Sequence, residues 1–300
     1  MLRSLTLASV IAVFLLLLLG GIVSSTGSGL GCGPNWPLCR GQLIPSLSEL
    51  EVFIEWFHRL IAGVAGLLVL ATAIVAWRRP GDVPSISAWA GTAVLLLFIQ
   101  VILGAITVRL ELPEEVSTAH LAVGTALFAV LIVMSTMAFQ SGSKPSQLST
   151  VSNPQTLIWI VIGITFAQMT LGAYVRHSGA GLACPDVFLC VGLPLQGPIL
   201  MQFLHRLGAL MVLGLVHVVG GRVRRSTGDP ALRRAALAAM VLVLAQIGLG
   251  MLSVTTLLST HATTAHLAVA LVLLGSLVFM ATRMTLWGRD SVAAAQEASR

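Results

Sequence analysis

The sequence predicts an all-α integral membrane protein with eight transmembrane helices, arranged as two pseudo-symmetric four-helix bundles. Three observations lead to this fold class. The 300 residues have a mean hydropathy of +0.95 and only 9% charged side chains, a composition that soluble globular domains do not have. Apolar stretches of about 20 residues recur along the chain, and each is long enough to cross a bilayer. A pattern of Cys and His residues also occurs twice, once in each half of the chain.

Eight stretches qualify as membrane spans. They cover residues 5–24, 52–77, 87–108, 117–139, 155–176, 199–221, 232–254 and 262–286. The first follows a positive charge at Arg3, as a secretory signal peptide would. Its apolar run is long for that role and no clean cleavage site follows, so we expect it to be retained as a span.

The distribution of basic residues favours an orientation with both termini in the cytoplasm. In that orientation only five of the 17 Lys and Arg residues are external, namely Arg40, Arg59, Arg109, Arg176 and Arg206. The excess on the cytoplasmic side is the bias that membrane proteins follow. The net charge of +6 therefore reflects topology. The basic residues are scattered over short loops and do not alternate with aromatic residues, which argues against a nucleic-acid partner. The expected surroundings are the lipids of the cell membrane.

Each half of the chain contains four spans. Residues 1–140 form the N-terminal half and residues 155–300 the C-terminal half, and the Ser-rich stretch 141–154 is a cytoplasmic linker. Because four is an even number, the two halves have the same orientation. The repeat is therefore parallel, with its axis along the membrane normal.

Four histidines occupy matching positions in the two halves. His58 and His120 are followed 147 and 146 residues later by His205 and His266. All four lie in the first turns of even-numbered spans, at one depth near the outer face. The residue one turn further on is small in each case, which would leave space for a flat ligand on the same helix face. These small residues are Ala62, Gly124, Ala209 and Ala270.

Two imidazoles on facing helices suit an axially ligated haem inside a four-helix bundle. Zinc would usually take further Cys, Asp or Glu ligands. The alternative for each His is a hydrogen-bonded packing role, and this is favoured for His177, His217 and His261, which do not share the pattern.

A second repeat consists of a Gln followed by a Gly four residues later, and it occurs at Gln100, Gln168 and Gln246. We interpret this repeat as a seam of close helix packing, and we favour this interpretation over one in which the glutamines line a pocket.

The four cysteines form two close pairs, Cys32 with Cys39 and Cys184 with Cys190, in the external loops. An oxidising outer compartment permits disulfides there. A structural staple and a redox-active pair remain equally open for each. A zinc site is less expected, because the pairs lie in different halves.

Charged residues beside the histidines complete the candidate sites. Arg59 and Arg206 directly follow a His, where they could bind haem propionates or extend to the membrane interface. Arg109 and Arg176, at external helix ends, are further candidates for propionate binding. Glu55 precedes His58 by three residues, whereas Gln202 holds the matching position before His205. A carboxylate can transfer protons, so the first site is expected to perform chemistry and the second to hold a cofactor. The alternative is that Glu55 pairs with Arg59 at a wet boundary.

The combination of these residues resembles the haem A synthase family, in the bacterial branch with two external cysteine pairs. The resemblance covers nearly the whole chain. It rests on the cysteine pairs, on Glu55-Trp56-Phe57-His58-Arg59, on Ala119-His120 and Ala265-His266, and on His205-Arg206.

The resemblance implies an enzyme that oxidises the C8 methyl of haem o to a formyl group, giving haem a for cytochrome oxidase. It places the haem o substrate between His58 and His120, and a haem b between His205 and His266. It gives Glu55 a role in the chemistry and Cys32–Cys39 a role in thiol–disulfide electron transfer. Haem O synthase and cytochrome oxidase assembly factors are the implied partners. Two other functions use the same residues: a di-haem b electron-transfer protein between quinone and thiols, and a haem carrier without turnover.

Overall fold

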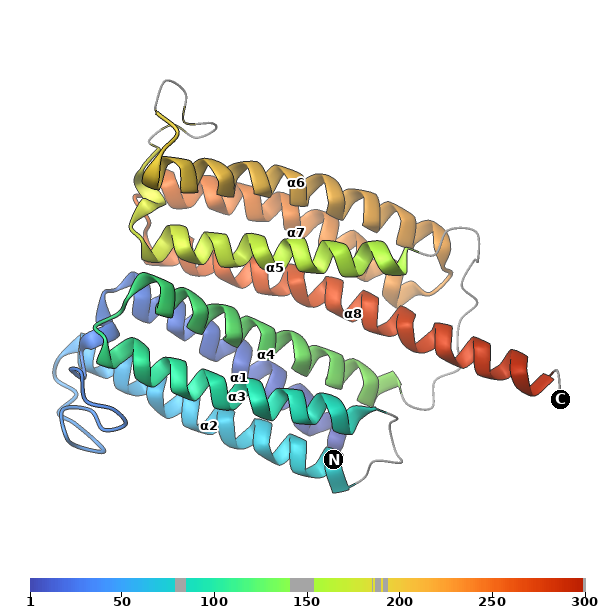
Figure 1. Cartoon of the computed structure of the whole chain (residues 1–300), viewed down its shortest axis with the longest axis horizontal. Helices are drawn as coiled ribbons and strands as arrows, with labels where there is room; N and C mark the ends of the chain where they lie inside the picture. Colours follow the sequence, from blue (N-terminus) through green and yellow to red (C-terminus); the bar gives the residue numbers. More distant parts are fainter. Residues whose placement is uncertain (79–84, 141–153, 185, 187–189, 191–193, 299–300) are drawn as a thin grey trace.

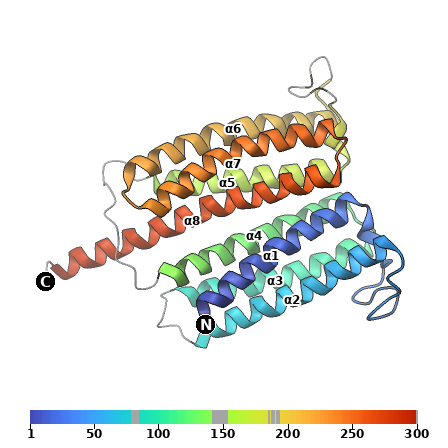
Figure 2. The same cartoon turned by 180° about the vertical axis from the view of Figure 1, so that it is seen from behind.

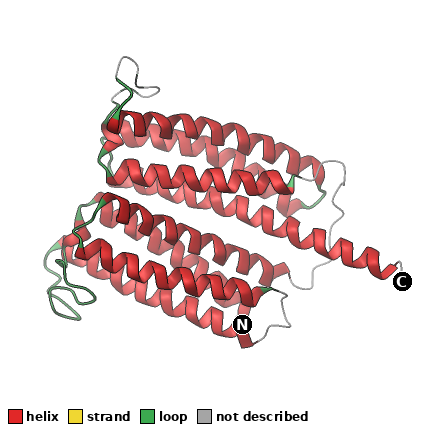
Figure 3. Cartoon of the chain, viewed as in Figure 1, coloured by secondary structure: helices red, strands yellow, loops and turns green. Residues whose placement is uncertain are grey.

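The computed structural model describes residues 1–78, 85–140, 154–184, 186, 190 and 194–298. Within these residues the regular structure is helical (Figure 3), as the sequence predicts. Nearly all of the expected linker 141–154 lies outside the described residues.

Eight long helices form the fold. They are α1 (Leu2–Ser25), α2 (Leu50–Arg78), α3 (Ile86–Arg109), α4 (Glu114–Gln140), α5 (Gln155–His177), α6 (Gly197–Ser226), α7 (Pro230–Thr255) and α8 (Thr260–Ala298). All eight are long and apolar enough to cross a membrane, which confirms the eight expected spans. Helices α6 and α8 continue beyond the predicted ends because polar residues there extend the helix past its apolar stretch.

The helices lie in two groups, α1–α4 and α5–α8, which pack side by side (Figures 1 and 2). In the first group each helix packs on the helices next to it in sequence, and α1 also packs on α4. The second group has the same arrangement, with α5 packed on α8. Each group is therefore a square of four helices, in which α2 lies diagonal to α4 and α6 diagonal to α8. Helices α4, α5 and α8, with α1, form the contact between the groups.

The two helices with the largest buried share, α4 and α8, both lie at this contact. Leu131 and Met134 of α4 and Leu271, Leu274 and Leu277 of α8 are fully buried. The outer helices instead keep large apolar side chains exposed, which is the pattern of a surface that faces lipid. Buried apolar side chains therefore join the two groups, while the outer helices present apolar side chains at the surface.

All four even-numbered helices begin at the same end of the molecule. The loops that contain the cysteines lie at that end, and both termini lie at the opposite end (Figure 1). The four histidines therefore lie at the cysteine end as well, about two turns into their helices. Which end faces the cytoplasm stays a prediction from the basic residues.

Candidate functional site

The histidines of each half face each other across the interior of their helix group. His58 and His120 come from the diagonal helices α2 and α4, and His205 and His266 from the diagonal helices α6 and α8. All four rings are only partly exposed. The structure therefore brings together the two pairs that the sequence matched.

A glycine on the preceding helix lies against each of the four imidazoles. A Cβ atom on Gly20, Gly104, Gly172 or Gly250 would stand 3.3, 3.1, 2.7 or 3.2 Å from the Cε1 atom of the facing His. A Cβ atom at 3.1–3.3 Å would require the ring to shift by a few tenths of an ångström, and one at 2.7 Å, as at Gly172, is closer than real Cβ contacts come. The sequence pattern located three of these glycines but did not indicate that they face a histidine.

Three of these glycines are preceded, one helical turn earlier, by a Gln whose amide contacts the same ring. The amide nitrogen lies 3.3 Å from His120 Nε2 for Gln100, 2.9 Å from His205 Nδ1 for Gln168, and 3.1 Å from His266 Nε2 for Gln246. The interpretation of this repeat as a packing seam is therefore incomplete. The glutamines are polar neighbours of the histidines.

The small residue one turn after His120 does not leave an empty slot. A Cβ atom on Gly124 would stand 2.9 Å from a methyl carbon of Leu17 and 3.0 Å from the amide nitrogen of Gln100. The expectation that Gly124 opens space for a ligand is wrong. Its missing side chain makes room for neighbours on α1 and α3.

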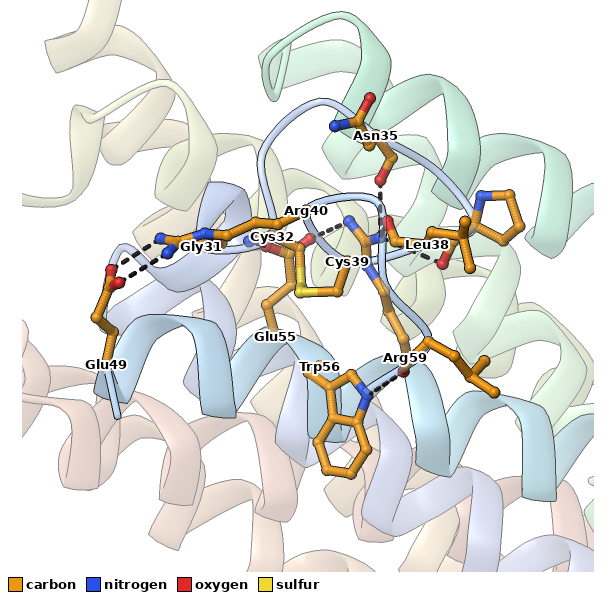
Figure 4. Close-up of a disulfide and its surroundings, with 12 residues drawn as sticks. Gly31, Cys32, Asn35, Leu38, Cys39, Arg40, Glu49, Glu55, Trp56 and Arg59 are labelled. Atoms are coloured by element: carbon orange, nitrogen blue, oxygen red, sulfur yellow. Dashed lines mark hydrogen bonds and ion pairs between the residues drawn. A yellow bond between two sulfur atoms is a disulfide. The ribbon is translucent and has the colours of Figure 1, made fainter. Parts of the chain in front are cut away.

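Glu55 connects the first disulfide to the helix that carries His58 (Figure 4). Cys32 and Cys39 form a disulfide, and the carboxylate of Glu55 accepts a 2.7 Å hydrogen bond from the Cys32 backbone N–H. Its other oxygen pairs with the Arg59 guanidinium. The side chain of Glu55 is only 4% exposed. Both oxygens of this buried carboxylate are therefore engaged, and the pairing with Arg59 that we considered does occur.

Gln202 makes the matching contact in the second half. Cys184 and Cys190 form the second disulfide, and the Gln202 side-chain oxygen accepts a 2.6 Å hydrogen bond from the Cys184 backbone N–H. The Gln202 amide also donates to the Gly181 carbonyl. The two halves thus share the geometry at this position and differ in its charge.

Arg59 and Arg206 both hold the cysteine loops. Arg59 donates to the carbonyls of Asn35 and Leu38, at 2.9 and 3.0 Å. Arg206 donates to the Cys184 carbonyl at 3.0 Å and pairs with Asp186 at 3.2 Å. Each arginine therefore has a carboxylate partner and backbone partners in its own half. Propionate binding by either one stays a prediction.

The first cysteine loop has two more attachments that the sequence did not reveal. The Arg40 guanidinium pairs with the Glu49 carboxylate through two hydrogen bonds of 2.7 Å. The hydrogen bonds from Arg40 lower the pKa of the Glu49 carboxyl. The Trp56 ring N–H donates to the Leu43 carbonyl at 2.9 Å (Figure 4). These contacts fix the loop over the start of α2.

The remaining polar candidates have different surroundings. Arg109 is exposed at the end of α3. Arg176 donates to the Ser24 carbonyl at 3.1 Å, and His177 Nδ1 lies 3.2 Å from the Thr118 hydroxyl, so both connect the two helix groups. His217 Nδ1 lies 2.9 Å from the Leu213 carbonyl of its own helix, as a packing histidine would.

The residues around each histidine pair fit an axially bound haem. The ring nitrogens Nδ1 of His58, His120 and His266 are buried without a hydrogen-bond partner in the described part of the chain. A buried imidazole nitrogen with no partner is costly, and a metal ligand bond can satisfy it. The first pair offers two such rings across its bundle interior, with a glycine beside each, which is a donor set suited to a metal in a flat macrocycle. The second pair offers one such ring, His266, because Nδ1 of His205 contacts the Gln168 amide.

The chain matches a known family along most of its length. The COX15-CtaA family model, described as cytochrome oxidase assembly protein, matches residues 3–278. A protein named "Heme A synthase" from Geobacillus kaustophilus is 34% identical over 266 residues, which cover 86% of this chain and 84% of the relative. Another protein of that name, from Alkalihalophilus pseudofirmus, is 31% identical over 280 residues, covering 92% and 94%.

The resemblance that the motifs suggested is therefore confirmed at the level of the family, over nearly the whole chain. The residues that carry it, from Glu55 in α2 to His266 in α8, all lie inside the matched range. The chain belongs to the COX15-CtaA family of cytochrome oxidase assembly proteins.

Proposed function

We propose that the protein is a haem A synthase, which oxidises the C8 methyl of haem o to a formyl group and so makes haem a for cytochrome oxidase. One observation carries the proposal, namely that the chain is similar over most of its length to proteins named "Heme A synthase". The two diagonal histidine pairs are consistent with a protein that binds haem. The electron-transfer and carrier functions would use the same histidines, but the relatives do not favour them.

The two pairs have different tasks in this proposal. His58 and His120 bind the haem o substrate, and His205 and His266 bind a haem b. Haem b supplies one-electron transfer when it is bound. The division is supported by one charge difference beside the first histidine of each half, since Glu55 has the neutral Gln202 as its counterpart.

Glu55 is the proposed catalytic residue. Oxidation of a methyl group to a formyl group removes both protons and electrons from the carbon, so a group that accepts protons must lie close to the substrate. Glu55 is a buried carboxylate three residues before His58, on the same side of α2. Arg59 balances its charge, which makes a carboxylate tolerable at this depth.

The cysteine loops cover the same end of both sites. We propose that this end faces outward, with both termini in the cytoplasm of the cell that carries the protein in its membrane. Cys32–Cys39 is the better candidate for an electron-transfer role, because the side chain that accepts the Cys32 N–H is the ionisable Glu55, whereas the neutral Gln202 accepts the Cys184 N–H. Arg109 and Arg176, like Arg59 and Arg206, remain predicted contacts for propionates. Haem O synthase and oxidase assembly factors are the proposed partners.

Extraction of haems tests the proposed function directly. Membranes that contain the protein together with a haem o source should yield haem a and a hydroxylated intermediate on chromatography. Membranes with the haem o source alone serve as the control and should yield only haem o and haem b. A folded, haem-loaded protein that leaves haem o unchanged would remove the synthase assignment.

The glycine approach to His205 gives a second test. In Gly172→Ala the new methyl group would stand 2.7 Å from His205 Cε1, so the ring must move. We expect haem occupancy of the second half to require about tenfold more haem, as for other changes next to a metal ligand. Gly163→Ala is the matched control on the same helix, because a Cβ atom there meets nothing within 4 Å. Equal haem titrations for the two variants would show that the close approach is unimportant.

A further inference from the structure

The first cysteine loop exposes a group of large apolar side chains. Leu43 is 79% exposed, Ile44 67% and Leu47 40%. We call these three residues the apolar tip of the loop. Apolar side chains that gather on an exposed segment mark a contact with a membrane or with another protein. The apolar tip is therefore a candidate docking surface.

The charge of this loop is compatible with contact to lipid. Across residues 33–48 the sequence has one charged side chain, that of Arg40. Its guanidinium pairs with the Glu49 carboxylate through two hydrogen bonds of 2.7 Å. An unpaired charge is costly to bring into a membrane. Because the charge of Arg40 is balanced, this cost does not oppose contact between the loop and lipid.

The loop lies beside α2, at the level where the membrane span begins. The Trp56 ring N–H donates to the Leu43 carbonyl at 2.9 Å, and Trp56 lies in the second turn of α2. The apolar stretch of that span begins at residue 52. Figure 1 shows the loop next to the start of α2, on the side away from the second helix group. The hydrogen bond therefore holds the apolar tip close to the depth at which lipid headgroups give way to hydrocarbon.

The surface of α2 next to the loop has the residues of a membrane interface. Phe53 and Phe57 are exposed one turn apart, and their rings stack with centroids 5.7 Å apart. Trp56 follows Phe53 by three residues, so the two share a face of the helix. Aromatic side chains concentrate where a membrane meets water. A lipid layer that covers these rings also reaches the apolar tip, whereas a protein partner would first have to displace that lipid.

We propose that the apolar tip inserts into the lipid leaflet at the cysteine end of the molecule, and that this insertion anchors the Cys32–Cys39 disulfide at the membrane surface. The partner is the boundary between the headgroups and acyl chains of a phospholipid layer, where segments with one apolar face bind. The balanced charge of the loop means that the lipid need not be anionic. This anchoring does not depend on the reaction that the protein catalyses.

Fluorescence quenching in vesicles tests the depth of the apolar tip. All four cysteines form the two disulfides, so Ser46→Cys introduces the single free thiol, between Ile44 and Leu47. The full chain is labelled there with a nitrobenzoxadiazole dye and reconstituted into phosphatidylcholine vesicles. Part of the lipid carries a nitroxide near the top of its acyl chain. We expect strong quenching by the nitroxide lipid and little quenching by iodide in the water.

Two further labelled positions calibrate the signal. Leu67→Cys, at a residue of the α2 span that is 69% exposed, gives the protection from iodide that lipid provides. Asn35→Cys is the matched control on the same loop, at an exposed polar residue outside the apolar tip. Strong iodide quenching at Ser46→Cys, with no effect of the nitroxide lipid, would place the tip in water, free for a protein partner, and would overturn the proposal.

A variant with a polar tip separates the loop's own side chains from the dye. Leu43→Gln with Ile44→Gln, in the Ser46→Cys background, removes two apolar side chains but keeps the backbone carbonyl that Trp56 binds. If these side chains anchor the loop, the variant loses most of the nitroxide quenching and gains iodide quenching. Unchanged quenching would show that the dye or the rest of the loop sets the depth, and the proposal would be wrong.

Discussion

Glu55→Gln should leave haem binding intact and reduce turnover by about 100-fold or more, the usual contribution of a group that transfers protons in the rate-limiting step. Glutamine occupies the matching position in the second half, where the Gln202 oxygen accepts the Cys184 N–H at 2.6 Å. The substituted side chain can therefore keep the bond to the Cys32 N–H. Arg59 loses its ionic partner but keeps the carbonyls of Asn35 and Leu38.

The measurement is the amount of haem a formed per haem-loaded protein, with the absorption spectrum as the check on binding. Glu49→Gln is the matched control. It makes the same chemical change at the other end of the same loop, where the pair with Arg40 is exposed and contributes little. Near-normal turnover in Glu55→Gln would make Glu55 a structural residue that only attaches the cysteine loop to α2.

Loss of either histidine from the second half should abolish the low-spin haem b spectrum. In His205→Ala or His266→Ala a single axial imidazole remains, so the haem is bound weakly or lost during purification. His58→Ala and His120→Ala should keep that spectrum and lose the conversion of haem o instead. The four variants thus separate the two sites by spectrum and by product.

His217→Ala is the control for these variants, because His217 is also an intramembrane histidine but its Nδ1 lies against the Leu213 carbonyl of its own helix. It should keep both the spectrum and the turnover. Retention of the haem b spectrum in His205→Ala would show that the assignment of the second pair is wrong. A loss of the spectrum in His58→Ala would reverse the roles of the two halves.

Much of the fold could be predicted because a bilayer restricts what a chain can do. Each apolar stretch had to be a helix, and the repeat from His58 to His205 and from His120 to His266 identified the pairs. A linear pattern also shows which face of a helix a residue occupies. It does not show what lies across from that face, so Gln100, Gln168 and Gln246 were interpreted as packing residues although each contacts a histidine.

The loops could be predicted least. The sequence placed Arg59 and Arg206 beside the histidines and suggested the pair of Arg59 with Glu55, but it did not indicate their loop partners, such as the Leu38 carbonyl and Asp186. A backbone carbonyl has no sequence signal, and its position depends on the path of a loop containing several prolines. The expectation that Gly124 leaves space for a ligand was wrong for a related reason. The space beside a small residue is filled by side chains of whichever helix lies next to it.

The arginine beside the first histidine of each half has a carboxylate partner in a different place. In the first half it is Glu55 on the helix, 4% exposed, and in the second it is Asp186 in the loop, 37% exposed. Dissolved ions screen exposed charge pairs strongly and buried pairs weakly. Salt in the surrounding medium will therefore weaken the Arg206 pair and spare the Arg59 pair. The second cysteine loop should loosen with rising ionic strength while the attachment of the first to α2 persists.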